Sequence, residues 1–248
     1  MIEVRDLWKS FGRETVLRGV NLTVEDGETI TILGKSGSGK TVLLKNIVGL
    51  MRPDRGSVLI DGVEVTRAKR RTLYNIRKNM GFVFQWSALF DSMTVFENVA
   101  MPLVEMKLSP KEIRERVDEA LELVEMAGTQ RLYPAELSGG MKKRVGVARA
   151  IVSRPRYLFY DEPTTGLDPV TADTICALIS DLDKKLGVTS VVVSHDMHLA
   201  TKVSDRIILL SDGVIAWEGR PEEAVSSRHG AIADFIEATS LQLEERGA

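Results

Sequence analysis

The sequence has almost no cysteine: Cys176 is the single one among 248 residues. One cysteine excludes a disulfide within the chain and a cysteine-based metal cluster, and a reducing compartment is the simplest expectation. Long apolar runs are also missing, because no stretch approaches the roughly 18 residues that a membrane-spanning helix needs. The polar start Met1–Arg5 does not resemble a signal peptide. Any membrane role is therefore expected to pass through a partner chain.

A large charge of one sign is lacking as well. The net charge is -2 and the sequence pI is near 6.0, which gives no electrostatic footprint for nucleic acid. The basic run Arg67–Arg71 is interpreted as a solvated loop or helix face. Of the three histidines, His198 and His229 have no informative context and are expected at the surface. We therefore expect no nucleic-acid partner.

The apolar pattern favours an α/β fold. Residues 2–33 alternate between apolar and polar and predict antiparallel strands, the last of which, Thr29–Leu33, is apolar enough to be buried. Residues from about 90 to 155 are helical in character, and Ser109-Pro110-Lys111-Glu112 predicts a capped helix start. Tyr157–Tyr160 and Ser190–Val193 are short apolar strands of the kind found in a sheet covered on both faces.

These patterns predict one α/β domain over residues 1–248. The core with an antiparallel β subdomain is expected at about 1–89 and 156–225. A helical subdomain is expected to be inserted at about 90–155. The tail, about 226–248, is predicted to be an amphipathic helix that packs on the domain or on a partner through its apolar residues Ile232, Phe235, Ile236, Leu241 and Leu243.

Gly34–Thr41 fits the phosphate-binding pattern G-x-x-x-x-G-K-[ST] and lies between a predicted strand and a predicted helix, as that motif requires. Backbone N–H groups at a helix start would bind the phosphates. Lys40 would reach the β- and γ-phosphates, and Thr41 would ligate Mg²⁺. Val42 stands where many such loops have a second hydroxyl, at a cost of about 1 kcal/mol of affinity. The predicted nucleotide ligands here are Gly34, Lys35, Ser36, Gly37, Ser38, Gly39, Lys40, Thr41 and Val42.

An acidic pair, Asp161-Glu162, follows the apolar strand Tyr157–Tyr160. Asp161 would hold the metal and Glu162 would act as general base on the attacking water. His195 follows the next apolar strand, where it would contact the γ-phosphate. Gln85 closes a strand, where it would sense the metal and the water. The candidate catalytic residues are thus Glu162, His195 and Gln85, and the candidate metal ligands are Thr41, Gln85 and Asp161.

Leu137-Ser138-Gly139-Gly140-Met141 indicates a second helix start able to bind an anion, through Ser138, Gly139 and Gly140. One chain needs only one phosphate site. The spare one suggests that this segment recognises a nucleotide held by a partner molecule.

Together these residues resemble the nucleotide-binding subunits of ABC transporters, over nearly the whole chain. In terms of that family, Gly34–Thr41 resembles the Walker A motif, Gln85 the Q-loop, Leu137–Met141 the signature motif, Tyr157–Asp161 the Walker B strand, Glu162 the catalytic glutamate, Gly166–Asp168 the D-loop and His195 the switch histidine. Phe11 resembles the aromatic that stacks on adenine, although by itself it would as often be a core residue. The resemblance implies an ABC-type ATPase with a P-loop NTPase core of the RecA-like type, which uses ATP and Mg²⁺. It also implies a head-to-tail homodimer, with Asp168 at the nucleotide, and transmembrane permease subunits contacted near the Q-loop.

A narrower resemblance lies in Phe84–Phe90, Met93–Ala100 and Gly140–Val145, which are similar to the ATPases of Mla-type, MCE-associated lipid transporters. Those ATPases have methionine where most signature motifs have glutamine, as here at Met141. The resemblance implies phospholipid as cargo, an MCE-type lipid-binding partner and a peripheral place on the cytoplasmic face of the inner membrane.

Other functions remain open from the sequence. An ATPase for export or import of peptides, amino acids or drugs would differ only near the Q-loop and in its partners. A soluble ABC ATPase acting on nucleic acid or ribosomes usually has two nucleotide domains or a coiled-coil insertion, neither of which is present. A non-ABC kinase or GTPase is disfavoured by Leu137–Gly140. Two positions depart from the commoner family pattern: Gly166 replaces alanine in the D-loop, and Tyr160 replaces an aliphatic residue.

Overall fold

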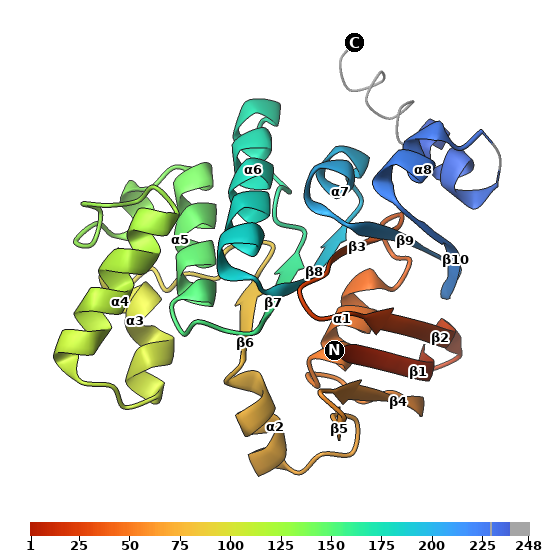
Figure 1. Cartoon of the computed structure of the whole chain (residues 1–248), viewed down its shortest axis with the longest axis horizontal. Coiled ribbons are helices and arrows are strands. Elements are labelled where there is room, and N and C mark those ends of the chain that lie inside the picture. Colours follow the sequence, from red (N-terminus) through yellow and green to blue (C-terminus); the bar gives the residue numbers. More distant parts are fainter. Residues whose placement is uncertain (229, 239–248) are drawn as a thin grey trace. The chain divides into compact units, whose positions relative to one another are not determined.

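The structure is a computed structural model that describes residues 1–228 and 230–238 (Figure 1). Internal contacts divide the chain into two units, residues 1–73 with 191–248, and residues 74–190. The predicted helical subdomain, about 90–155, lies inside the second unit. That unit also contains the two strands on either side of the helical segment, which pair with each other.

The first unit contains an antiparallel sheet of the order β2-β1-β4-β5. Its strands are β1 (Ile2–Phe11), β2 (Glu14–Val24), β4 (Arg55–Ile60) and β5 (Val63–Glu64). The period-2 pattern explains the pairing, because Ile2, Val4 and Leu7 are fully or almost fully buried while the polar residues between them are not. The predicted antiparallel subdomain is confirmed, except that Thr29–Leu33, the last strand of the predicted set, belongs to the other sheet and pairs in parallel with residues 206–209.

A second set of strands in this unit has the order β10-β9-β3-β8. The strands are β3 (Thr29–Leu33), β8 (Thr189–Ser194), β9 (Arg206–Ser211) and β10 (Val214–Gly219). All five residues of β3 are buried, and β3 pairs in parallel with β9. A buried strand in a parallel sheet is covered on both faces, which explains why Ile30, Ile32 and Leu33 are aliphatic and why the two threonines of the strand are also buried.

Helices α1 (Lys40–Ile47), α7 (Met197–Val203) and α8 (Pro221–Ser226) belong to the same unit, and residues 231–238 are also helical. Ile232 and Phe235 are buried in a cluster with Leu33, Ala200 and Leu209. The predicted amphipathic tail therefore packs on its own unit as far as residue 238. Leu241, Leu243 and His229 lie outside the described residues.

The second unit contains the parallel strands β6 (Met80–Val83) and β7 (Tyr157–Asp161). Its helices are α3 (Val95–Glu105), α4 (Pro110–Leu123), α5 (Gly139–Ile151) and α6 (Pro169–Leu186), with a short 3-10 turn at Pro134–Glu136. Figure 1 shows α3, α4 and α5 side by side, and contacts join each pair of them. The capping box predicted at Ser109 is present, with Glu112 as its second member.

Helix α2 (Arg70–Arg77) lies at the boundary between the two units. It begins inside the basic run 67–71, whose four arginine and lysine residues are all exposed. The interpretation of this run as a solvated loop or helix face is confirmed.

Asn98 in α3 holds the segment between β6 and α3. Its side chain is fully buried, accepts from the Phe90 N–H at 2.8 Å, and donates to the carbonyls of Phe90, Met93 and Thr94 at 3.0–3.1 Å. We expect Asn98→Ala to lower the free energy of unfolding by about 3 kcal/mol, because buried backbone groups lose their partners. Urea denaturation measures this, with Asn75→Ala on the exposed surface of α2 as the control. Equal shifts in the two variants would contradict the assigned role.

Candidate active site

The glycine loop of the first unit joins β3, which ends at Leu33, to α1, which begins at Lys40. Gly37 and Gly39 have φ of 82° and 99°, values that side chains rarely allow. A Cβ on Gly34 would lie 2.5 Å from the Leu210 carbonyl oxygen, so the backbone passes too close for any other residue. Gly39 is the N-cap of α1 and has no side chain to cover the helix start, which leaves that end to an anion.

Two side chains of this loop fit a bound phosphate group. Lys40 is 6% exposed, and its Nζ donates to the carbonyls of Gly34 at 2.8 Å and Lys35 at 3.1 Å, so the ammonium lies across the loop. The Ser38 Oγ is buried and has no hydrogen-bond partner among the described residues. A phosphate oxygen would supply that partner. Lys35, Ser36 and Gly37 are exposed, while Thr41 and Val42 are partly buried in the first turn of α1.

Phe11 and His195 are the other predicted site residues of the first unit. Phe11 ends β1, is 48% exposed, and has the Lys9 Nζ 5.5 Å from its ring centroid. It is therefore not a core residue, and its ring face is available for stacking. His195 directly follows β8 and is exposed, as is His198.

The acidic pair lies in the second unit. Asp161 is the last residue of β7, and Glu162 follows it, buried to 9% exposure with a φ of 49°. A glutamate in the left-handed region is strained, and such strain persists only where surrounding contacts hold it. The Thr165 hydroxyl donates to the Glu162 carboxylate at 3.3 Å.

Gln85 lies two residues beyond the end of β6 and is partly buried. Its carbonyl accepts a hydrogen bond from the Nζ of Lys143 in α5, and the same Nζ donates to the Glu162 carbonyl at 3.4 Å. The Lys143 side chain therefore hydrogen-bonds to the backbone of both Gln85 and Glu162. Burial lowers the pKa of Lys143 to about 8, against the opposing effect of the Glu162 and Asp161 charges. Lys143 could not be identified from the sequence, because nothing in Lys142-Lys143-Arg144 distinguishes a buried lysine from an exposed one.

The predicted second helix start is present at α5. The Ser138 hydroxyl accepts from the Met141 N–H at 3.3 Å and so caps the helix. A Cβ on Gly140 would lie 2.6 Å from the Thr171 Cγ2 in the first turn of α6, so this position requires glycine. Asp168 caps α6 by accepting from the Thr171 N–H at 3.0 Å, and the hydrogen bonds with Thr171 lower the pKa of that carboxyl.

Both departures from the family pattern have a structural reason. Gly166 has a φ of 81°, which an alanine would adopt only with strain. Tyr160 is fully buried, and its hydroxyl donates to the Asp183 carboxylate in α6 at 3.3 Å. Neither departure affects a candidate catalytic group.

The candidate metal ligands fit Mg²⁺ better than a metal ion that is coordinated by protein side chains alone. Within residues 1–228 and 230–238, no three or more His, Cys, Asp or Glu side chains gather as a metal cage. Mg²⁺ is usually held by one or two carboxylates together with substrate phosphates. Thr41 offers a hydroxyl in the first unit and Asp161 a carboxylate in the second, and each is an oxygen donor of a type that Mg²⁺ accepts.

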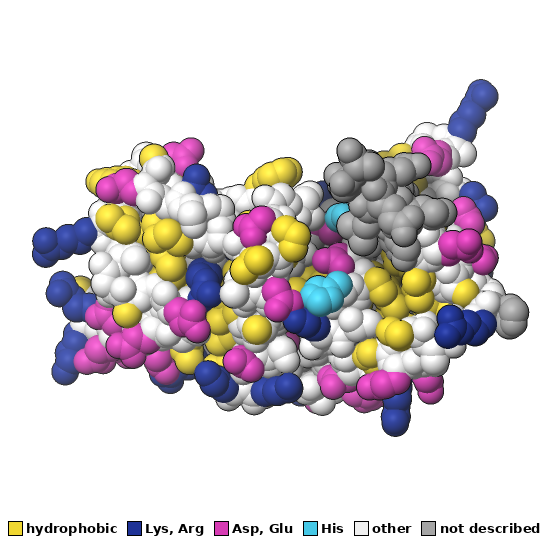
Figure 2. Space-filling model, turned by 90° about the horizontal axis from the view of Figure 1, so that it is seen from above, with side chains coloured by type: hydrophobic (Ala, Val, Ile, Leu, Met, Phe, Trp, Pro, Cys, Tyr) yellow, Lys and Arg dark blue, Asp and Glu magenta, His cyan; other side chains and the backbone are white. Residues whose placement is uncertain are grey.

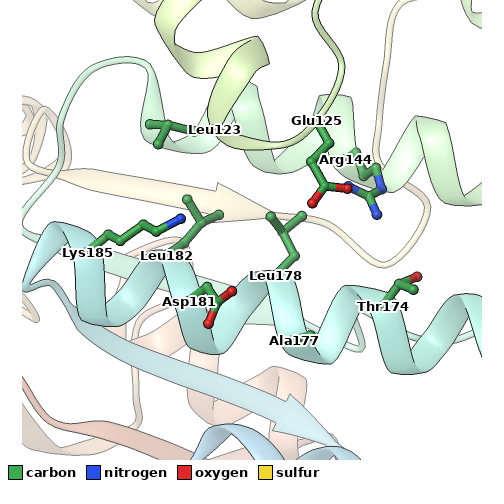
Figure 3. Close-up of a pocket in the computed structure, with 9 residues that line it drawn as sticks. All are labelled: Leu123, Glu125, Arg144, Thr174, Ala177, Leu178, Asp181, Leu182 and Lys185. Atoms are coloured by element: carbon green, nitrogen blue, oxygen red, sulfur yellow. The ribbon is translucent and has the colours of Figure 1, made fainter.

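The second unit also has a pocket of about 170 Å³ beside α6 (Figure 3). Figure 3 shows Arg144 and Glu125 turned toward each other above α6, and their ion pair measures 2.8 Å. The pocket is below the roughly 300–1,000 Å³ typical of ligand sites, and none of the candidate site residues lines it. The lining residues are Leu123, Glu125, Arg144, Thr174, Ala177, Leu178, Asp181, Leu182 and Lys185.

The surface shows no concentration of one charge on the face drawn in Figure 2, where acidic and basic side chains are interspersed. Among the described residues, the helices are too short or too polar to cross a bilayer.

Comparisons with known proteins agree with these motifs. Residues 17–165 match the family model described as "ABC transporter". The chain is 40% identical over 236 residues to the "Probable ribonucleotide transport ATP-binding protein mkl" of Mycobacterium leprae, covering 95% of this chain and 68% of the relative. It is 45% identical over 200 residues to the "Methionine import ATP-binding protein MetN" of Carboxydothermus hydrogenoformans, covering 81% of this chain and 59% of that relative. The chain thus spans about two thirds or less of the length of these relatives.

Solved structures are similar over most of both chains. One is the dimeric ATP-binding cassette MJ0796 in a post-hydrolysis state with ADP and Pi, with a TM-score of 0.81 and 36% identity over 89% of this chain and 99% of that one. Another is cbiO1 of Clostridium perfringens, with a TM-score of 0.85 and 31% identity over 99% and 96%. The predicted fold class, an ABC ATPase with a P-loop core, an antiparallel sheet and a helical subdomain, is confirmed. The chain belongs to the ABC transporter family, as an ATP-binding subunit that hydrolyses ATP with Mg²⁺.

Proposed function

We propose that this chain drives phospholipid transport through separate transmembrane subunits, as a homodimer on the cytoplasmic face of the inner membrane with an MCE-type lipid-binding partner. The observation that carries the choice of cargo is Met141, which follows Ser138-Gly139-Gly140 where most signature motifs have glutamine. The aromatic segment Phe84–Phe90 around Gln85 supports the same choice through its resemblance to Mla-type ATPases.

We assign the nucleotide-binding role to Phe11 and to the loop Gly34–Val42. The exposed Phe11 ring suits stacking on adenine, and the unpartnered Ser38 hydroxyl and the Lys40 ammonium suit the phosphates. Thr41, Gln85 and Asp161 would hold Mg²⁺, which neutralises developing phosphate charge when bound. Glu162 would take a proton from the attacking water, and His195 would contact the γ-phosphate.

The proposed dimer is head to tail, and the start of α5 in one copy completes the nucleotide site of the other. Support comes from Ser138, Gly139 and Gly140, which begin a helix without being needed for the chain's own phosphate loop. Asp168 would lie at the same interface.

The permease subunits are proposed to contact the surface around Gln85. Three aromatic residues lie within a few residues of Gln85 in the sequence, and their side chains are exposed: Trp86 to 75%, Phe90 to 48% and Phe84 to 41%. Exposed aromatics of this kind are enriched in protein interfaces.

Import of a small solute is the second candidate. It is favoured by the 45% identity to a protein named for methionine import and the 40% identity to one named for ribonucleotide transport. The two candidates share the ATPase mechanism and differ in cargo and membrane partners.

Cargo is tested by purifying the chain in complex with its native membrane partners and identifying bound molecules by mass spectrometry. We expect phospholipid to co-purify and to stimulate ATP turnover in reconstituted vesicles, whereas methionine and ribonucleotides leave turnover unchanged. The Glu162→Gln complex is the control, because stimulation there would show that the assay does not report on this site. A complex without lipid that responds to one of the small solutes would establish the second candidate instead.

A further inference from the structure

One side of α5 contacts the segment that contains Gln85. Lys143, Gly146 and Arg149 recur every three residues and so lie near one another on the helix surface. Lys143 donates to the Gln85 carbonyl, and Arg149 donates to the carbonyls of Ser87 at 2.6 Å and Ala88 at 2.7 Å. A Cβ on Gly146 would be 3.4 Å from the Ser87 Cβ, which is an ordinary van der Waals distance, so α5 lies in direct contact with this segment.

The backbone that these contacts hold is strained. Ser87 and Ala88 have φ of 59° and 44°, and Glu162 has a φ of 49°. Residues other than glycine occupy this region only where surrounding contacts compensate for the strain. In both segments α5 supplies a side-chain donor to the carbonyl of a strained residue, and at Glu162 the Thr165 N–H also donates to that carbonyl at 3.3 Å.

Lys143 is the one of these three residues that contacts both segments. It is 5% exposed, and its ammonium donates to the carbonyls of Gln85 and Glu162. Burial lowers the pKa of this ammonium to about 8, so removing it from water has a cost that the two carbonyls and the nearby carboxylates offset. If Lys143 served only to fill space, Lys143→Met would leave ATP turnover unchanged, because methionine has a similar size.

We propose that Lys143 is a positioning residue for ATP hydrolysis, which fixes the backbone of Gln85 and that of Glu162 to a common point on α5. This inference rests on the roles proposed above for those two residues. Because Ser138 caps the same helix about 7 Å away along its axis, a shift of the helix start would reach Gln85 and Glu162 through Lys143. The lysine thereby links the segment that would face a second copy to the chain's own catalytic groups.

The test compares Lys143→Met, which keeps the length but removes the ammonium, with Lys143→Arg, which keeps the charge and donors. For Lys143→Met we expect kcat to fall about 10- to 100-fold, since small displacements of catalytic groups have effects of that size. The KM for ATP is expected to stay within about two-fold, because the phosphate loop keeps its own contacts. Lys143→Arg is expected to restore most of kcat. Lys142→Met, the same change one residue earlier, is the matched control and should keep kcat within about two-fold.

A double-mutant cycle with Glu162→Gln separates this inference from the proposed function. If Lys143 acts through Glu162, adding Lys143→Met to Glu162→Gln lowers the residual turnover little further. Wild-type turnover by Glu162→Gln alone would overturn the assignment of Glu162 as the base. The positioning role of Lys143 would then be judged from the kcat of the Lys143→Met single variant. Loss of turnover by Glu162→Gln together with unchanged kcat in Lys143→Met would overturn only the positioning role. If Lys143→Met fails to fold, Lys143→Gln replaces it in the test. A rise in the KM for ATP as large as the loss of kcat would count against the inference.

Discussion

Glu162→Gln is expected to abolish ATP turnover while ATP binding persists. The substitution keeps the size of the side chain but removes its ability to accept a proton from water. Loss of a general base typically costs about 10²- to 10⁴-fold in rate. The phosphate loop, Gly34–Thr41, lies in the other unit and keeps its own contacts. Steady-state phosphate release and equilibrium binding of a fluorescent ATP analogue measure the two properties separately.

The same variant is expected to accumulate as an ATP-bound dimer, because the step that would reopen the dimer no longer occurs. Size-exclusion chromatography with ATP and with ADP detects this. Glu122→Gln, the same chemical change at an exposed position of α4, is the control and should behave as the wild type. Normal hydrolysis by Glu162→Gln would falsify the assignment of the base.

Ser138→Arg is expected to stop hydrolysis although it leaves the phosphate loop of its own chain intact. The large cation would occupy the start of α5, where the γ-phosphate of a second copy's nucleotide is proposed to bind. The loss of the cap to the Met141 N–H would cost only about 1 kcal/mol of stability. Ser138→Ala loses the same cap without adding bulk, and it is the control for that effect. Thermal denaturation and binding of ATP to each variant complete the comparison.

Mixing two inactive variants tests the dimer more sharply. Lys40→Ala destroys the phosphate loop, and Ser138→Arg destroys the segment that would serve the partner. In a head-to-tail mixed dimer, one site has both defects and the other has none, so activity returns. With random assembly of equal amounts, about a quarter of wild-type activity is expected if the sites act independently. If the mixture stayed as inactive as its components, each chain would have to complete its own site, and the proposed arrangement would be abandoned.

The candidate site was largely predictable wherever its signal is local. The strand before the glycine loop, the helix after it, and the strand before Asp161 all follow from short apolar runs next to residues with few conformational options. The positions of Gly34 and Gly39 favour glycine because of a close backbone approach or a positive φ, and both are fixed positions of the sequence motif.

The burial of Lys143 was not predictable, because it depends on a contact with Gln85, 58 residues earlier in the chain. The four hydrogen bonds of Asn98 are local, to residues four to eight positions earlier, but no sequence motif marks them. Helix α6 was also missed, although Asp168-Pro169 at its start and Gly187 at its end are ordinary helix signals. Asp168 is both the predicted D-loop aspartate and the cap of α6.

The placement of β3 also has a consequence for synthesis of the chain. Its neighbours are β8 and β9, and the Thr29 N–H at its start donates to the carboxylate of Asp205, which is synthesised 176 residues later. At about 5–20 residues per second, the strand waits roughly 9–35 s on the ribosome before its sheet can close. A strand that is buried in the folded unit is prone to aggregate while it stays unpaired, so the synthesis of the segment 189–211 determines when the phosphate-binding segment can acquire its fold.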